Sequence, residues 1–595
     1  MDRSPDTPPP RQLVLLCDGT NNTLSGRLAD THVVLLAELL RRFPDGDGER
    51  LIYYDPGVGN PGVLPGTTWI DSAHRKQQRL FGLAFGRGLY DNVAEGYRFL
   101  MANWRPGDQV FLFGFSRGAF TARSIGGMVN AFGIVDGHQD TLVDSLVATY
   151  FAPQTRPRRA VQQQAARLFG QDRPGESWPM LHFVGVWDTV ASVGVWPFAL
   201  KITASPDLAG KHFRHVRQAL ALDEQRASYQ PRAYAQDDGP FALADGSGGD
   251  VRQRWFRGAH CDVGGGYLYA DSELSRTPFA WLAAEAMACG LRLSGLQVQP
   301  GEAGEDAVRR VLPLLDPPCP PRRPARVSSQ TSAMPLWALA GLQVRDTRHA
   351  AIDGRPGQPV AMQAHPSVAA WQAVFPAGTA WCGGWIWRHW KLLVLALVFL
   401  AVFVLQAGEA LHVPPQGAAW GARFAAAQQA NWALACWQGS LATMQAWRAT
   451  ALAFDHPFHA LGWDLPLIVA YACLLSMPAS WAFARCAGLV RFGQRVPGWL
   501  RSAGWALPLM VAADLAEDGL TALAFALLLH WPQPGAVDGI LHGVPLPALQ
   551  ALLLALRVLV WLASAAKWAG LAGVAGLFVA GGLKRQERQL AGGRG

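Results

Sequence analysis

The sequence predicts a mostly parallel α/β domain followed by an all-α region of several transmembrane helices. In residues 11–375, short apolar runs alternate with helical patterns, which is typical of a parallel sheet with helices on both faces. In residues 376–595, several stretches almost without charge approach the roughly 20 apolar residues that cross a bilayer. Half of the 595 residues are apolar and 16% are charged, which excludes a disordered or fibrous chain. Residues 1–10 are polar and rich in proline, and we expect them to be flexible.

Three short apolar runs predict buried strands of the sheet. They lie at residues 12–17, 109–114 and 181–187, and each is followed by a loop of polar or turn-forming residues. Helical patterns lie between and after them, the clearest at residues 84–103 and 278–288. Because ligands bind at the C-terminal ends of parallel strands, we expect functional residues in the loops that follow these three runs.

The loop after the second run reads Gly114-Phe-Ser-Arg-Gly118, a G-x-S-x-G motif between a strand and a helix. Glycines on both sides of Ser116 permit the sharp turn that exposes its hydroxyl, and the following helix N-terminus directs amides toward developing negative charge. The alternative is a structural glycine-rich turn, because the bare motif is weak in a chain with 63 glycines. The strand before it and the helical pattern after it favour a nucleophilic serine.

A nucleophilic serine needs a base and a carboxylate that orients the base. In α/β-hydrolases the chain order is Ser, acid, His, and Asp188 after the third run and His260 in a glycine-rich loop satisfy this order. We therefore predict that Ser116, Asp188 and His260 form a catalytic triad in an α/β-hydrolase-like domain. The alternatives that remain are Asp223, Asp262 and Asp271 for the acid and His365 for the base.

We expect the oxyanion hole to combine the backbone N–H of Arg117 with one from Gly19 or Thr20, in the loop beyond the first strand. The Arg117 side chain is a candidate for attracting a phosphate, with a solvent-facing arginine as the alternative. No spacing of residues is typical of a metal site, and the eight cysteines form no C-x-x-C pair, so we expect neither a metal nor another cofactor.

Four stretches of the second half are candidates for transmembrane helices: residues 391–410, 464–484, 503–531 and 546–583. The alternative is a set of buried core helices, but four such stretches exceed what a soluble core needs. Lys and Arg lie at the start of the first stretch, between the second and third stretches and after the fourth, whereas residues 530–545 contain neither. The positive-inside rule then predicts four spans, with both termini and the α/β domain on the cytoplasmic side.

The third stretch carries three acidic residues, Asp514, Glu517 and Asp518. Charges within an apolar span are costly and are functional candidates by default. We favour the alternative, a structural pairing with Arg557 or Lys567 on the fourth stretch.

The net charge of +8 does not indicate nucleic-acid binding, because the basic residues are scattered along the chain without long runs. Part of this charge lies in the arginine-rich flanks of the predicted spans, where it favours contact with anionic lipid. We therefore expect a membrane bilayer, and no nucleic acid, as a partner.

Several ordered motifs together resemble one family, the Tle1-like phospholipase effectors of type VI secretion systems, over about residues 11–375. The motifs are residues 15–22, 114–123, 184–190, 219–224, 258–267 and 365–368. The resemblance implies a serine hydrolase with an α/β-hydrolase fold that releases fatty acid from glycerophospholipids. It places the nucleophile, acid and base on Ser116, Asp188 and His260. Cys261, at a position where the family often has serine, departs from the pattern.

The predicted function is a membrane-anchored serine hydrolase that cleaves acyl ester bonds of glycerophospholipids, within a multi-pass protein of the bacterial inner membrane. The resemblance also implies an antibacterial effector that is delivered to a target cell, with a secretion-system component or an immunity protein as partner. Two alternatives remain open: an esterase or thioesterase on other acyl substrates, and a non-catalytic membrane protein with a degenerate hydrolase domain.

Overall fold

The computed structural model separates the chain into two compact units. The first comprises Met1–Gln330, Val344–Phe375 and Val490–Val496, and the second comprises Thr331–Gln343, Pro376–Leu489 and Pro497–Gly595. The structure describes residues 9–19, 29–46, 48–57, 83–152, 156–169, 178–190, 192–193, 200–201, 207–271, 273–315, 327, 334–347, 362–370, 389–410, 457–487, 490, 492–529 and 546–592.

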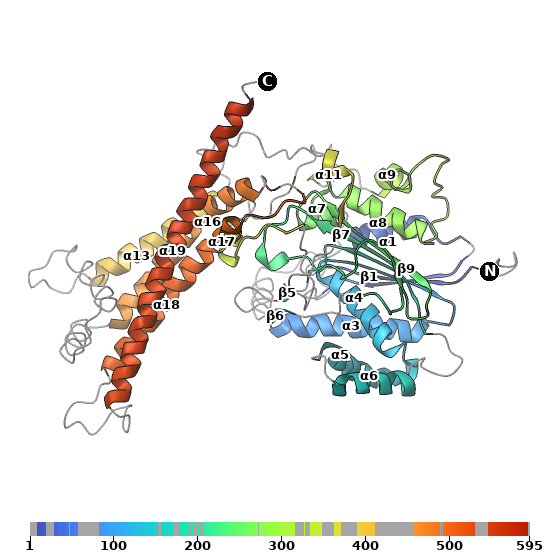
Figure 1. Cartoon of the computed structure of the whole chain (residues 1–595), viewed down its shortest axis with the longest axis horizontal. Helices are drawn as coiled ribbons and strands as arrows, with labels where there is room; N and C mark the ends of the chain where they lie inside the picture. Colours follow the sequence, from blue (N-terminus) through green and yellow to red (C-terminus); the bar gives the residue numbers. More distant parts are fainter. Residues whose placement is uncertain are drawn as a thin grey trace, which may run out of the picture. The chain divides into compact units, whose positions relative to one another are not determined.

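The first unit is built on one mixed sheet (Figure 1). Its strands lie in the order β10-β9-β7-β4-β3-β1-β2, with all these neighbours parallel, and β8 pairs antiparallel with β9. The prediction of a mostly parallel α/β sheet is thus confirmed. The strands are β1 (Gln12–Cys17), β2 (Arg50–Asp55), β3 (Gln109–Phe115), β4 (Leu181–Trp187), β7 (Phe213–Ala221), β8 (Gly239–Ala242), β9 (Gly248–Phe256) and β10 (Gln363–Ala364), with β5 (Ser192–Val193) and β6 (Leu200–Lys201) in a separate antiparallel pair.

Strands β1, β3 and β4 are mostly apolar because both of their faces are covered. In β1, Leu13 and Leu15 pack into one core cluster, whereas Val14 and Leu16 pack into the other. This alternation follows from the two-residue period of a strand. It explains why the predicted strands read as continuous apolar runs. β1 and β4 have the predicted bounds, and β3 extends one residue further, to Phe115.

Helices cover each face of the sheet, as Figure 1 shows. One core cluster includes residues of α3, α4, α5 and α6, and the other includes residues of α1, α8 and α9. The helices of this unit are α1 (His32–Arg42), α3 (Leu83–Asn103), α4 (Arg117–Phe132), α5 (Val143–Phe151), α6 (Arg156–Phe169), α7 (His260–Gly264), α8 (Arg276–Ala288), α9 (Gly304–Leu315) and α11 (Ser367–Ala370), with 3-10 turns η1 (Gly137–Leu142), η2 (Ala227–Tyr229) and η3 (Tyr269–Asp271).

The strand order reverses at β1, which lies between β2 and β3. The connection after β1 leads to β2 on one side, and the later strands are added on the other side. Such a reversal opens a crevice at the C-terminal ends of the strands, where open parallel sheets bind ligands. The loop that holds Ser116 lies at this position.

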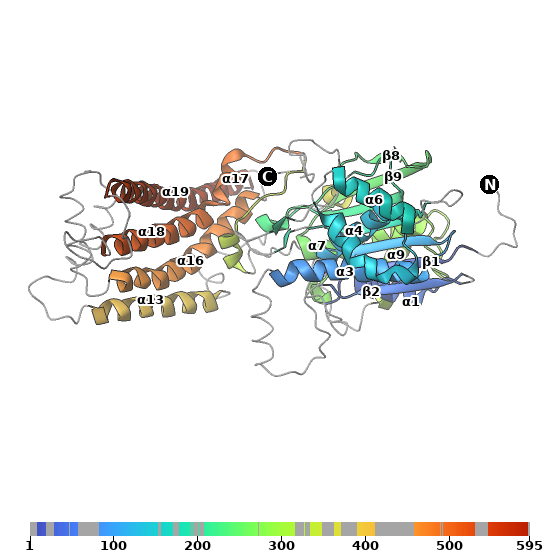
Figure 2. The ribbon, with the colours of Figure 1, turned by 90° about the horizontal axis from the view of Figure 1, so that it is seen from below.

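The second unit is helical. α13 (Trp390–Ala410), α16 (Pro457–Ala487), α18 (Ala506–Leu529) and α19 (Leu546–Gly592) lie side by side (Figure 2), with the short α17 (Gly498–Ala503) and the 3-10 helix η4 (Pro335–Ala340) against them. Each of the four long helices overlaps one predicted transmembrane stretch. The arrangement buries small and sulfur-containing side chains, such as Ala482 and Cys473 of α16.

Two of these helices are long and apolar enough to cross a membrane, at Leu465–Ala487 and Leu554–Ala580, within the described part of the chain. α18 is not apolar enough for a span because it carries three acidic residues. The apolar stretch Trp390–Val402 of α13 is shorter than a span. The sequence thus predicted four spans, whereas two helices meet the length and composition of a span. The four-span arrangement remains a prediction. Residues 530–545, which orient that arrangement, lie outside the described residues.

Two of the three acidic residues of α18, Asp514 and Glu517, pair with Lys567 as the structural alternative expected. The Lys567 ammonium of α19 forms ion pairs with Asp514 and with Glu517, at 3.4 Å for Glu517, and the Tyr471 hydroxyl of α16 donates to Asp514. Because Asp514 and Glu517 are buried, these contacts offset the desolvation of their carboxylates. The side chain of Arg557, the other predicted partner, lies outside the described part of the structure.

Candidate active site

Ser116 lies in a sharp turn between β3 and α4. Its φ of 60° is positive, which is strained for a residue with a side chain. A Cβ at Gly114 would lie 2.5 Å from the carbonyl oxygen of Gly118, and a Cβ at Gly118 would lie 2.3 Å from the carbonyl oxygens of Cys17 and Asp18. Both flanking residues must therefore be glycine for the turn to close against the loop after β1.

Asp188 follows β4 directly and is also strained, with a φ of 44°. Among the described non-glycine residues, Ser116 and Asp188 are the two with positive φ. Backbone hydrogen bonds hold both turns: Ser116 N–H donates to the Trp187 carbonyl at 3.1 Å, and Asp188 N–H donates to the Ala219 carbonyl at 2.7 Å. Strain that the surrounding structure maintains at two neighbouring strand ends is typical of functional sites.

The structure brings the three predicted side chains into one hydrogen-bonded chain. Nε2 of His260 lies 2.8 Å from Oγ of Ser116, and Nδ1 of His260 lies 2.5 Å from Oδ2 of Asp188. Because an ionised carboxylate can only accept, Nδ1 carries the proton and Nε2 accepts the serine hydroxyl. All three residues are buried, with His260 3% and Asp188 0% exposed.

His260 is held from several sides at the start of α7. Its backbone N–H donates to Oε2 of Glu224 at 3.2 Å, and its ring packs against the rings of Phe115 and Tyr229 at centroid distances of 4.6 and 5.0 Å. Burial lowers the pKa of His260 below its ordinary value, and the hydrogen bond and charge of Asp188 oppose this in part. The imidazole is therefore neutral near pH 7, as a general base must be.

The Asp188 carboxylate receives hydrogen bonds on both oxygens. The Arg345 guanidinium donates to Oδ1 at 2.5 Å and to Oδ2 at 2.9 Å, and the Ala221 N–H donates to Oδ1 at 2.9 Å. Burial by itself raises the pKa of Asp188, but the charge of Arg345 and the hydrogen bond from His260 outweigh it and hold the pKa at about 2. Asp188 is therefore ionised at neutral pH.

A second buried ion pair lies behind His260. The Arg226 guanidinium donates to both oxygens of Glu224, at 2.8 Å each, and its charged group lies 3.5 Å from the ring centroid of Tyr229. Burial raises the pKa of Glu224, but Arg226 overcomes this and lowers the pKa to about 2. The pair fixes the segment after β7 on which the His260 backbone rests.

The predicted oxyanion hole is only partly described. Arg117 is the first residue of α4, so its amide lies at the helix N-terminus beside Ser116. The Gly19 N–H donates to Oδ1 of Asp18 at 2.6 Å in this structure. Thr20 lies outside the described residues. The oxyanion hole stays a prediction.

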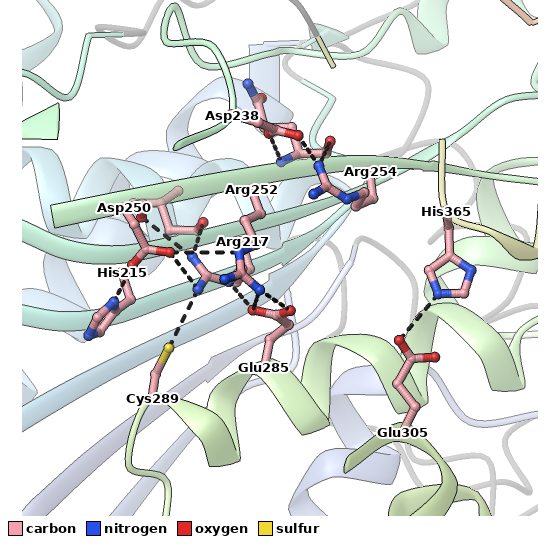
Figure 3. Close-up of polar contacts among 12 residues, drawn as sticks. His215, Arg217, Asp238, Asp250, Arg252, Arg254, Glu285, Cys289, Glu305 and His365 are labelled. Atoms are coloured by element: carbon pink, nitrogen blue, oxygen red, sulfur yellow. Dashed lines mark hydrogen bonds and ion pairs between the residues drawn. The ribbon is translucent and has the colours of Figure 1, made fainter. Parts of the chain in front are cut away.

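The alternative acid and base residues lie apart from this chain of contacts. Asp223 accepts from Arg257 and from the Gly258 amide, and Asp262 accepts from the Ala259 amide. His365 bonds Ser367 and Glu305 and stacks on Phe256; Figure 3 shows it with Glu305. Asp271 ends the short 3-10 turn η3.

Two further side chains bear on the chemistry of the site. Burial raises the pKa of the Cys261 thiol to about 12, so Cys261 remains protonated beside His260. Among the described residues, no group of three or more His, Cys, Asp or Glu side chains has the arrangement of a metal site.

Sequence reasoning missed Arg345, and it assigned no role to Glu224, Arg226 or Tyr229. Glu224 belongs to residues 219–224, one of the motifs that carried the family resemblance. The motif marked the residue, but it did not indicate that Glu224 binds the His260 backbone. No local pattern marks Arg345, because an arginine in a loop has no periodicity to interpret. Its role depends on the fold, which brings residues 345 and 188 together.

Comparisons with known proteins point to one family. Residues 11–285 match the model of the type VI secretion system phospholipase effector Tle1-like catalytic domain. An uncharacterised protein of Saccharomyces cerevisiae is 28% identical over 232 residues, which are 37% of this chain and 32% of that protein. This chain thus spans about a third of the curated relative it matches. An uncharacterised protein from Pseudomonas aeruginosa, known from a crystal structure, aligns with a TM-score of 0.26 and 16% identity, over 85% of this chain and 66% of that one. The resemblance expected from the motifs is confirmed for residues 11–285, the part of this chain that the model of the Tle1-like phospholipase effector catalytic domain matches.

Proposed function

We propose that this chain is a membrane-anchored serine hydrolase that cleaves acyl ester bonds of glycerophospholipids. The observation that carries the proposal is the hydrogen-bonded chain from Oγ of Ser116 through the His260 ring to Asp188, on a strained turn that begins α4. The match of residues 11–285 to a phospholipase effector domain supports a lipid as substrate.

The geometry supports the following mechanism. Ser116 Oγ attacks the acyl carbonyl carbon while Nε2 of His260 takes the hydroxyl proton, which gives a tetrahedral oxyanion and an imidazolium. The ionised Asp188 stabilises the imidazolium and keeps the imidazole in the tautomer with its proton on Nδ1. The imidazolium then protonates the leaving lysophospholipid oxygen, and an acyl-enzyme forms on Ser116. Water, activated by the same imidazole, releases the fatty acid and restores the serine.

The N-terminus of α4 supports stabilisation of the oxyanion. The Arg117 amide and the aligned peptide dipoles of this helix place partial positive charge beside Ser116. Removal of one oxyanion donor commonly costs about 10²–10³ in rate, so this group is a substantial part of the proposed catalysis.

Exposed apolar faces support the membrane anchor. The stretch Leu554–Ala580 of α19 is only 22% buried within the protein, and its Trp561 and Trp568 are 53% and 58% exposed. In α13, Leu397 and Val398 are about as exposed. Contiguous apolar surface of this kind marks contact with a membrane or another protein, and a bilayer would hold the hydrolase beside an insoluble substrate.

The proposed role in the cell follows from the family. An effector of this kind is delivered to a target cell, where a lipase attacks the membrane, and an immunity protein in the producing cell would prevent self-damage. The alternative location is the inner membrane of the producing cell, in a four-span arrangement with the hydrolase on the cytoplasmic side. An epitope inserted within residues 530–545 tests this orientation. The four-span arrangement places the segment outside the cytoplasm, so the epitope should be labelled from that side of the membrane.

The test of the activity uses the purified full chain with vesicles of mixed phosphatidylethanolamine and phosphatidylglycerol. We expect fatty acid and the matching lysophospholipid as products, resolved by lipid-class analysis, together with labelling of Ser116 by a fluorophosphonate. Labelling without lipid products, but with hydrolysis of short-chain esters or thioesters, would indicate another acyl substrate. Absence of both labelling and hydrolysis would contradict the serine-hydrolase proposal and favour a non-catalytic domain.

For the anchor, we expect the chain to remain with membranes after alkaline carbonate extraction. The double variant Trp561→Arg, Trp568→Arg should lower the fraction that stays with membranes, because an arginine at the centre of a span costs about 2.5–3.5 kcal/mol on insertion scales. Retention is lowered and not abolished, since the stretch Leu465–Ala487 is unchanged. The matched control is Leu168→Arg, an exposed apolar residue of α6 in the first unit, which should leave the distribution unchanged. Release of the unmodified chain by carbonate would contradict the anchor.

A further inference from the structure

A fully buried arginine from beyond the family match holds the acid of the triad. Arg345 lies outside residues 11–285 but belongs to the first unit. The side chains of Arg345 and Asp188 are both 0% exposed. The two terminal guanidinium nitrogens each donate to a different Asp188 oxygen, at 2.5 and 2.9 Å, in the bidentate geometry that only arginine provides.

The same guanidinium is fixed by the backbone on either side of the site. One terminal nitrogen also donates to the Ala221 carbonyl at 2.6 Å, and the other donates to the Tyr229 carbonyl. Ala221 ends β7, and its own N–H binds Asp188. Arg345 therefore joins the end of β7, the η2 turn and the carboxylate into one rigid unit, so the carboxylate has one orientation toward His260.

The charge of Arg345 also changes what Asp188 does for His260. An ionised carboxylate beside a histidine stabilises the imidazolium and raises the histidine pKa. A full positive charge at hydrogen-bond distance on that carboxylate offsets part of this effect. In a site that excludes water, the offset is larger than it would be at the surface.

The other charges around His260 do not replace this effect. Glu224 and Arg226 form a pair with each other, so their charges largely cancel at the imidazole. Ser116, Asp188, Glu224 and Tyr229 contact His260, Arg226 acts on it through its charge, and Arg345 contacts Asp188 behind the ring. Asp188, which is paired with Arg345, is the group that accepts the hydrogen bond from Nδ1 of His260.

We propose that Arg345 is a positioning residue of the triad: it orients the Asp188 carboxylate and, by neutralising it, keeps His260 unprotonated, and the hydrolase active, at lower pH than an Asp–His pair alone would. The proposal rests on the proposed role of Ser116, Asp188 and His260 as a catalytic triad. It implies that the catalytic unit extends beyond the matched domain to include the segment Val344–Phe375.

The test compares the full-length wild type with Arg345→Gln and Arg345→Lys. The readouts are the pH profile of kcat/KM for ester hydrolysis and the pH dependence of fluorophosphonate labelling, which needs no lipid substrate. For Arg345→Gln we expect the acid limb of both profiles to move up by about one pH unit, because the carboxylate is no longer neutralised. We expect the plateau to fall about 10- to 100-fold, because the carboxylate loses its fixed orientation.

Arg345→Lys separates charge from orientation. It retains the positive charge but not the planar fork, so the acid limb should stay near its wild-type position while the plateau falls. The matched control is Arg217→Gln, which removes another buried arginine, in the middle of β7, that pairs with Asp250 and Glu285 (Figure 3). Arg217→Gln should lower the stability of the fold as Arg345→Gln does, but it should leave the acid limb of the pH profile at its wild-type position.

The outcomes distinguish the two proposals. An unshifted acid limb in Arg345→Gln, or the same shift in Arg217→Gln, would overturn the role of Arg345 while leaving the triad intact. Should Arg345→Gln fail to fold, Arg345→Lys decides: a slower plateau with the wild-type limb supports the proposal, and a wild-type plateau overturns it. Labelling that follows these expectations without phospholipid hydrolysis would support Arg345 and contradict only the lipid substrate. Absence of labelling in the wild type would overturn both.

Discussion

Ser116→Ala is expected to lower fatty-acid release from phospholipid vesicles by about 10⁶-fold, to the level that binding and the oxyanion donors alone provide. The reason is that the hydroxyl is the only group of the chain of contacts that can form the acyl-enzyme, and His260 has no other nucleophile at Nε2 among the described residues. The measurement is the initial rate of release at neutral pH, with fluorophosphonate labelling in parallel.

The matched control is Ser124→Ala, the same substitution within α4. Ser124 is fully buried, and its hydroxyl makes no hydrogen bond within the described structure. We therefore expect full activity from this variant. If Ser116→Ala retained release at the wild-type rate, the nucleophile would lie elsewhere and the proposed mechanism would be wrong.

Asp188→Asn is expected to lower kcat by about 10⁴-fold and also to destabilise the fold. The neutral amide no longer selects the His260 tautomer with its proton on Nδ1. It also leaves the Arg345 charge buried without its partner, and the loss of one partner of a buried pair costs about 3–5 kcal/mol. The control is Asp238→Asn, an acidic residue paired with Arg254 away from the site, which should retain activity (Figure 3).

The destabilisation should depend on pH in a defined direction. The pKa of Asp188 is about 2 in the folded protein, which is below its value of about 3.9 in an unfolded chain. A carboxyl with a lowered pKa contributes stability above its unfolded pKa and loses it as the pH falls toward the folded pKa; here the contribution is about 2 kcal/mol. The difference in unfolding free energy between wild type and Asp188→Asn should therefore shrink as the pH falls from about 5 toward 2. A difference that is constant over this range would contradict the ionised state of Asp188.

Much of the α/β unit could be predicted from local sequence. β1 and β4 have the predicted bounds because a strand buried on both faces must be a continuous apolar run. The turn at Ser116 could be predicted because glycines two residues to either side leave the space that it needs. The order of serine, acid and histidine along the chain then selected Asp188 and His260, which the structure brings within hydrogen-bond distance of each other.

The helical unit was predicted less well. Apolar stretches indicated four helices, and helices occupy all four places, but hydropathy alone does not separate a span from a helix packed in a bundle. The charges of α18 pair with Lys567 within the unit, and this pairing depends on how α18 and α19 pack. The packing of the helices decides which apolar side chains are buried by protein and which remain exposed.

The sequence by itself determined the elements: which runs become strands, where the chain must turn at glycine, and which polar residues follow the strand ends. These properties follow from sterics and from the two-residue and 3.6-residue periods of side-chain burial, which are local. Only the tertiary structure decided that Arg345 pairs with Asp188, that Glu224 binds the His260 backbone, and that His365 bonds Glu305. The physical reason is that an ion pair between residues far apart in the chain depends on the path of the whole backbone, and no local pattern records that path.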